Sequence, residues 1–193
     1  IQNLMSKNSF KVLRPGINST FQDLGRDNLY HVGLPFSGAI DKRNFLIANS
    51  LITNRKEDAV LEFAFQGPCL QYFGSKRSFV ITGDVNFKMT RNDNNQVEGE
   101  CYKTIDINNG DIIDIFSTNK SVYGYFSVSG GFKLNKVWDS YSTTLRANVG
   151  PNNGNKLMDA QEIILNASKS ISNRQLNFVN SKIEYIRVIK GTN

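Results

Sequence analysis

The chain has 193 residues, of which 39% are hydrophobic and 21% are charged, a composition typical of globular proteins. No apolar run approaches the roughly 20 residues that a membrane-spanning helix needs, and the first residues lack the apolar core of a signal peptide. We therefore expect a cytoplasmic protein without a membrane partner. The net charge of +6 comes from dispersed lysines and arginines, which argues against a nucleic-acid partner.

Residues that bind metals or form nucleophilic triads are scarce. His31 is the only histidine, and Cys69 and Cys101 lie far apart without metal-ligand spacing. The chain also lacks a G-x-x-x-x-G-K-[ST] loop and a strand–GxGxxG–helix unit. We expect no metal site, two reduced cysteines and no nucleotide bound by this chain alone.

The first predicted elements are a strand, a polar segment and a helix. An alternating strand at 10–14 ends at a Pro-Gly turn. Residues 22–41 then combine charged and hydrogen-bonding side chains with three glycines, which suits a shaped surface better than a spacer. Asp41 is the expected N-cap of a helix that runs to about Thr53 with an apolar stripe along one side.

The remainder of the chain is predicted to form short strands separated by turns. The very polar link at 92–96 is typical of a solvated hairpin tip. Residues 138–154 are expected to form a long functional or connecting loop, and residues 167–180 an exposed linker. Many short strands with one helix predict a mainly β fold, either a barrel or a sandwich. The expected strands are 59–65, 69–73, 78–82, 87–90, a strand near 100–105, 111–116, 122–128, 162–165 and 185–189.

Glu62 is the most informative single residue, because it is a carboxylate in an otherwise apolar strand. A buried carboxylate must be paired, hydrogen-bonded or protonated. It is therefore either a ligand-facing or catalytic acid, or an inward carboxylate that accepts backbone amides of a loop such as 22–41. The two interpretations overlap, because a loop fixed in this way can itself form the site.

Four other polar residues are candidates near the first glycines or at a strand end. Asp23 and Arg26 are close enough in sequence to pair across a turn, either to bind a carboxylate or ureido oxygen or to brace that turn. Ser37 has no nearby base and is expected to hydrogen-bond rather than to act as a nucleophile. Asp84, at a strand end, is a weaker candidate for facing a cleft.

Several motifs in this order resemble the biotin-dependent carboxyltransferase / allophanate hydrolase subunit 2 family, which includes the C subunit of 5-oxoprolinase and the carboxyltransferase part of urea carboxylase. The similarity covers nearly the whole chain. The motifs are Gln22-Asp-Leu-Gly-Arg26, the segment 33–41, Ala48-Asn49, and the segments 61–68, 81–84, 125–131, 140–143 and 185–191.

The departures from the family pattern are local, apart from length. Asp27 and Asp139 stand where the family usually has glycine, and Asn28 can take over the left-handed conformation near the first of them. Family members typically continue into a second β-subdomain. We therefore expect a first carboxyltransferase-type subdomain at 1–135, and a connecting loop with the start of a truncated second subdomain at 136–193.

The resemblance implies a cyclophilin-like β-barrel that works in a complex. Its expected partners are a companion subunit of related fold (the subunit 1 or B type) and a 5-oxoprolinase A-type subunit. ATP, or carboxybiotin in a urea carboxyltransferase, would be supplied through these partners, and the substrate would be a small amide. The leading function is ATP-dependent conversion of 5-oxoproline to glutamate, in a hydrolase or carboxyltransferase assembly inactive without its partners. A second possibility is a non-catalytic module that antagonises a kinase-inhibitor partner.

The residues expected to line or brace the cleft fall into two groups. Glu62 and Asp41 are the catalytic candidates, with Glu62 positioning the loop or moving a proton. The substrate-binding candidates are Gln22, Asp23, Arg26, Ser37 and Asn49.

Overall fold

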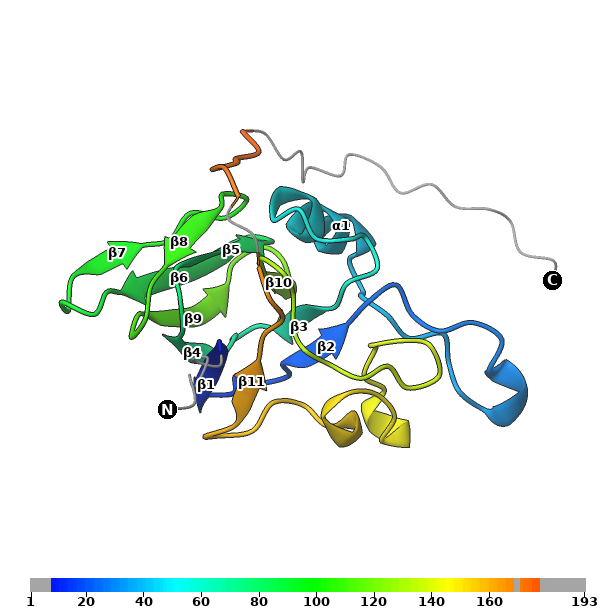
Figure 1. Cartoon of the computed structure of the whole chain (residues 1–193). Helices are drawn as coiled ribbons and strands as arrows, with labels where there is room; N and C mark the ends of the chain where they lie inside the picture. Colours follow the sequence, from blue (N-terminus) through cyan, green and yellow to red (C-terminus); the bar gives the residue numbers. More distant parts are fainter. Residues whose placement is uncertain (1–7, 169–170, 178–193) are drawn as a thin grey trace.

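The computed structural model describes residues 8–168 and 171–177 and shows a mainly β fold with one α-helix in that part of the chain (Figure 1). The short helical turns are η1 (Tyr30–Val32), η2 (Leu145–Ala147) and η3 (Asn152–Gly154), and the α-helix is α1 (Lys42–Leu51). The strands are β1 (Ser9–Arg14), β2 (Thr20–Gln22), β3 (Val60–Ala64), β4 (Cys69–Phe73), β5 (Arg77–Thr82), β6 (Val85–Thr90), β7 (Gln96–Glu98), β8 (Ile105–Ile107), β9 (Ile112–Thr118), β10 (Tyr123–Val128) and β11 (Glu162–Ile164).

The strands form two antiparallel sheets. One has six strands in the order β11-β1-β4-β9-β6-β7, and the other has five in the order β2-β3-β10-β5-β8. A single apolar core takes side chains from both sheets, with the Phe126 ring 5.5 Å from that of Phe10 and 5.6 Å from that of Phe79. The sheets are not closed into a barrel within the described residues. The mainly β class is confirmed, and of the barrel and the sandwich the sandwich is the better description.

Helix α1 covers the outer face of the five-stranded sheet. Its buried residues Phe45 and Ala48 pack on a second, smaller core with Val80 and Tyr125. This second cover explains why β3, β5 and β10 are buried on both faces, whereas strands such as β6 alternate between buried and more exposed residues. No helix in the described part of the chain has the length and hydrophobicity to cross a membrane.

The helix begins and ends close to its predicted bounds. The Asp41 carboxylate accepts the Asn44 amide at 3.0 Å, so the N-cap prediction is confirmed. The helix ends at Leu51, with Ile52 as its C-cap. Asp41 itself is half-buried and lies at the end of the glycine-punctuated segment, so the cap fixes where that segment joins the sheet.

Of the strand predictions that fall on described residues, all but one are confirmed, and the short strands β2, β7 and β8 were not predicted. The polar link does form a hairpin tip, but β6 pairs with β7 (Gln96–Glu98), so the strand expected near 100–105 was wrong. The chain turns there instead, with Tyr102 at φ +59° and its amide bonded to the Ile81 carbonyl. The three-residue strand β2 was missed just where the polar segment begins. The strand expected at 185–189 lies outside the described residues.

Candidate functional site

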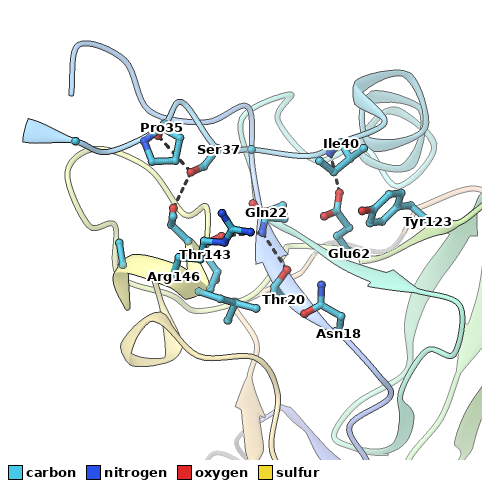
Figure 2. Close-up of a pocket in the computed structure, with 15 residues that line it drawn as sticks. Asn18, Thr20, Gln22, Pro35, Ser37, Ile40, Glu62, Tyr123, Thr143 and Arg146 are labelled. Carbon is cyan, nitrogen blue, oxygen red and sulfur yellow. Dashed lines mark hydrogen bonds between the residues drawn. The ribbon is translucent and has the colours of Figure 1, made fainter. Parts of the chain in front are cut away.

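A cleft of about 640 Å³ opens beside the edge of the five-stranded sheet (Figure 2). Its walls come from β2 and the segment after it, from strands β3 and β10, and from the loop that contains η2. Gln22, Ser37 and Glu62 are the predicted site residues that the fold brings together here. Other lining residues are Asn18, Thr20, Gly33, Pro35, Gly38, Ile40, Tyr123, Thr143, Thr144, Leu145, Arg146 and Ala147.

Glu62 lies on β3 and is 6% exposed. Its Oε2 accepts the Ile40 amide at 2.8 Å and the Tyr125 hydroxyl at 2.7 Å, so the expected bond to a backbone amide of residues 22–41 is present. Figure 2 shows the other carboxyl oxygen pointing into the cavity. Burial raises the pKa of Glu62, because the surroundings penalise the charged form more than the two hydrogen bonds favour it. This carboxyl can therefore hold or accept a proton at the cleft wall.

Gln22 provides a second polar group beside Glu62. Its Nε2 donates to the Thr20 hydroxyl at 2.9 Å and to the Thr143 carbonyl at 3.1 Å. Its Oε1 is buried and has no hydrogen-bond partner among the described residues, and the same is true of the Thr143 hydroxyl. An unsatisfied buried polar group costs about 1–3 kcal/mol. A ligand or water that bonds these two atoms would therefore be bound favourably.

Ser37 faces the cleft because the segment makes a close crossing there. Gly38 has φ +89°, and a Cβ on it would lie 2.8 Å from the Gly25 nitrogen, so only glycine fits. The Ser37 hydroxyl shares a 2.6 Å hydrogen bond with that of Thr144 and also donates to the Pro35 carbonyl at 3.3 Å. As predicted, Ser37 is a hydrogen-bonding residue: it connects the two loops that flank the cleft.

Asp23 joins the same two loops from behind the cleft wall. Its carboxylate accepts the Gly25 amide, the hydroxyls of Ser140 and Ser142, and the Tyr141 amide. We call this set of bonds the Asp23 clasp. The clasp occupies the carboxylate fully, so the Asp23–Arg26 ion pair expected from the sequence is wrong: the described residues contain no such pair within salt-bridge distance.

Arg26 instead braces the η2 loop and does not line the cleft. It is 3% exposed, and its guanidinium donates to the Thr144 hydroxyl at 2.8 Å and to the Ser142 carbonyl. Burial lowers the pKa of Arg26, opposed by the nearby charge of Asp23. The nearby Asn28 has φ +61°, so it does adopt the left-handed conformation that replaces the family's glycine.

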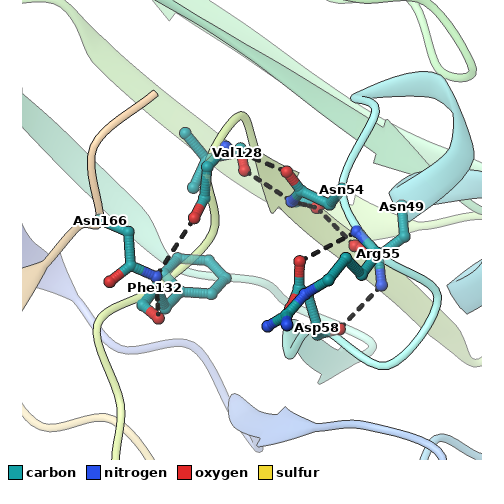
Figure 3. A network of polar contacts seen from close by, with 9 residues as sticks. Asn49, Asn54, Arg55, Asp58, Val128, Phe132 and Asn166 are labelled. Atoms are coloured by element: carbon teal, nitrogen blue, oxygen red, sulfur yellow. Dashed lines mark hydrogen bonds and ion pairs between the residues drawn. The ribbon is translucent and has the colours of Figure 1, made fainter. Parts of the chain in front are cut away.

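Asn49 and Asp41 lie away from this cleft. Asn49 lies on the buried face of α1, where it donates to the Asp58 carbonyl at 2.7 Å and accepts the Ser127 hydroxyl at 3.2 Å (Figure 3). Both ends of its amide are thus used within the fold. Asp41 lines a different cleft of about 670 Å³, together with Asp84.

Sequence reasoning missed Arg146 and the three threonines that line the same cleft. Thr20 is on the unpredicted strand β2, and Thr143, Thr144 and Arg146 belong to a loop that had been described only by its composition. The signal was present in part, because Ser140–Thr143 is one of the family motifs. No cluster of three histidine, cysteine or acidic side chains suited to a metal occurs in the part of the chain that the structure describes.

The amino-acid sequence matches a known protein family over most of its length. The sequence model of the carboxyltransferase domain, subdomain A and B, matches residues 32–193. The chain belongs to this carboxyltransferase family. The Gln-Asp-Leu-Gly-Arg motif, whose aspartate forms the clasp, lies just before the matched region.

Relatives of the carboxyltransferase family carry two different names. The C subunit of 5-oxoprolinase from Haemophilus influenzae is 31% identical over 75% of this chain and 45% of its own length. The urea amidolyase of Lachancea kluyveri is 28% identical over 82% of this chain and 8% of its own. The crystal structure of Kluyveromyces lactis urea carboxylase superposes with a TM-score of 0.76 at 27% identity, over 84% of this chain and 14% of that one. The chain thus spans less than half the length of these relatives.

Proposed function

We propose that this chain forms one wall of the substrate cleft in an ATP-dependent amide-processing complex, specifically a cytoplasmic 5-oxoprolinase that opens 5-oxoproline to glutamate. Family membership and the similarity to a protein named as the C subunit of 5-oxoprolinase support this proposal. Since the chain contains no phosphate-binding loop, ATP would be bound by companion subunits of the B and A types. The substrate would be shared between this chain and its companion.

The observation that carries the proposal is that Glu62 and Gln22 line the same cleft. An amide has an N–H donor beside a carbonyl acceptor. A site that binds it therefore needs a hydrogen-bond acceptor for the N–H and a donor for the carbonyl. The open Glu62 oxygen and the unpartnered Gln22 Oε1 provide two places for the N–H. A Glu62 carboxyl that holds a proton can also donate to a carbonyl oxygen or transfer that proton as the amide bond breaks.

The experiment is an assay of ATP-dependent 5-oxoproline cleavage by the complete complex, assembled from this chain and its companion subunits. Glu62→Gln keeps the shape of the side chain but removes its acid–base function, and we expect it to lower turnover by about 100-fold or more. Glu57→Gln, an exposed glutamate outside the cleft, is the matched control and should stay within about twofold of the unaltered complex. Full activity of Glu62→Gln would contradict the proposed role of Glu62.

The second candidate function is transfer of a carboxyl group from carboxybiotin to urea. It is favoured by the relatives and the solved structure that carry urea amidolyase and urea carboxylase names. The same complex is therefore also assayed with urea and a carboxybiotin carrier. Urea carboxylation without 5-oxoproline cleavage would replace the first function with the second.

A further inference from the structure

Arg146 is the only cationic side chain that lines the cleft within the described part of the chain. It lies on η2 and is exposed, and it makes no hydrogen bond or ion pair with any other described residue. Glu62 is the one acidic residue in the same lining. Figure 2 shows the Arg146 guanidinium and the Glu62 carboxyl on opposite sides of Gln22. The cleft therefore has a cationic end and a proton-holding end.

The loop that carries Arg146 is held in place by the surrounding structure. The Thr143 amide donates to the Phe21 carbonyl at 3.0 Å, and the Thr144 amide donates to the Val149 carbonyl at 2.7 Å. Asn148, with φ +51°, closes the turn after η2. Because the backbone beneath the guanidinium is already fixed, binding a ligand has to order only the side chain of Arg146.

A second guanidinium, that of Arg26, braces the loop behind this end of the cleft. Arg26 bonds the Thr144 hydroxyl and the Ser142 carbonyl, which are both neutral acceptors. The charge of Asp23 opposes that of Arg26, because the neutral donors of the clasp do not cancel it. Thr143 also lines the cleft, and its buried hydroxyl has no partner among the described residues. Arg146 is therefore the guanidinium that a ligand in the cleft can contact, and guanidiniums bind carboxylates through paired hydrogen bonds.

We propose that Arg146 and Thr143 form a carboxylate subsite, so that the cleft takes an amide bearing a carboxylate, such as a lactam acid, in preference to a neutral amide. The carboxylate would lie against Arg146 and the amide would face Gln22 and Glu62. This inference rests on the proposed amide-processing function and specifies the substrate class within it. It makes Arg146 the residue that separates 5-oxoproline from urea, because urea has no group for the cationic end.

The test compares two lactams that differ only in the carboxylate. Binding of 5-oxoproline and of 2-pyrrolidinone to the complete complex is measured by isothermal titration calorimetry. We expect Arg146→Ala to weaken 5-oxoproline binding by about 10- to 100-fold, as loss of a charged hydrogen bond does, and to leave 2-pyrrolidinone within about twofold. Arg146→Lys should recover part of the loss, because it restores the charge without the two-pronged geometry.

The matched control is Arg174→Ala, which removes an exposed guanidinium that bonds the Ser50 carbonyl outside the cleft. It should leave the affinity for both lactams unchanged. The subsite is overturned if Arg146→Ala leaves 5-oxoproline affinity intact, if it weakens both lactams equally, or if the unaltered complex does not bind 5-oxoproline at millimolar concentration. A complex that binds 5-oxoproline through Arg146 but does not cleave it would keep the subsite and overturn the proposed reaction.

Discussion

At the scale of single residues, Glu62 shows how a buried carboxyl can be held and still remain available. One oxygen is fixed by the Ile40 amide and the Tyr125 hydroxyl, and the second is left to the cleft. The two bonds favour the charged form, whereas burial disfavours it more strongly, so the pKa is raised. This rise in the pKa of Glu62 can be measured through the pH dependence of the free energy of unfolding.

We predict that Glu62 makes the protein less stable as pH rises. Because its pKa is higher in the folded than in the unfolded state, its contribution to stability is fully present below the ordinary glutamate pKa and is lost as pH rises through the raised value. Glu62→Gln cannot ionise. The free energy of unfolding of the unaltered protein, relative to this variant, should therefore fall across that pH window.

The measurement is urea unfolding of both proteins at a series of pH values. The exposed control Glu57→Gln should differ from the unaltered protein by no more than about 0.5 kcal/mol at each pH. Parallel pH profiles for the unaltered protein and Glu62→Gln would show that burial does not raise the pKa of this carboxyl.

At the scale of elements, the Asp23 clasp connects the segment after β2 to the loop before η2. Four donors from these two segments converge on one carboxylate. The cleft walls therefore depend on a single residue that does not face the cleft. This arrangement separates the groups that would contact a ligand from those that hold them in position.

We predict that Asp23→Asn destabilises the fold by about 2–4 kcal/mol, because the new NH₂ group faces donors and leaves at least one buried donor unsatisfied. Chemical denaturation measures the loss, and amide hydrogen exchange should accelerate at Gly25 and Tyr141, whose amides bond the carboxylate. Asp27→Asn, a nearby exposed position, is the matched control and should stay within about 0.5 kcal/mol. Unchanged exchange at Tyr141 would show that the clasp does not hold the loop.

The sequence predicts the elements better than it predicts their contacts. The alternation and the capping residue locate β1, β4, β9, β10 and α1, because these patterns are local. Apart from the Gly25 amide, the side-chain partners of Asp23 and Arg26 lie more than 110 residues away, so spacing within one motif suggested a pair that the fold does not form. Glu62 was identified because a carboxylate in an apolar strand is unusual in itself. Arg146 sits in a loop whose composition is ordinary, so it became a candidate only when the fold brought it to the cleft.

At the scale of the whole molecule, the two sheets share one apolar core, and Phe126 lies within it. Its ring is 5.5 Å from that of Phe10, on the six-stranded sheet, and 5.6 Å from that of Phe79, on its own sheet. We predict that Phe126→Ala lowers the free energy of unfolding by about 3–5 kcal/mol in a single transition, because it leaves a cavity in contact with both sheets.

The matched control for this prediction is Phe65→Ala, which truncates a phenylalanine that is 58% exposed. It should cost far less than the core variant, because its ring already contacts water. Denaturation is followed by both fluorescence and circular dichroism. Two separate transitions in Phe126→Ala would show that the sheets unfold independently and that the shared core does not couple them.

The clasp also sets an order of events during protein synthesis. Asp23 and its partner Ser140 are 117 residues apart in sequence, and closing a loop of that length costs about 4 kcal/mol of chain entropy. A nascent chain therefore carries the Glu62 and Gln22 groups long before their opposite wall leaves the ribosome. Until then the glycine-punctuated segment has an open side and an unpaired carboxylate. In a series of ribosome-bound nascent chains of increasing length, ligand affinity should thus appear abruptly, once the residues around Arg146 have emerged and the sheets beneath them have folded.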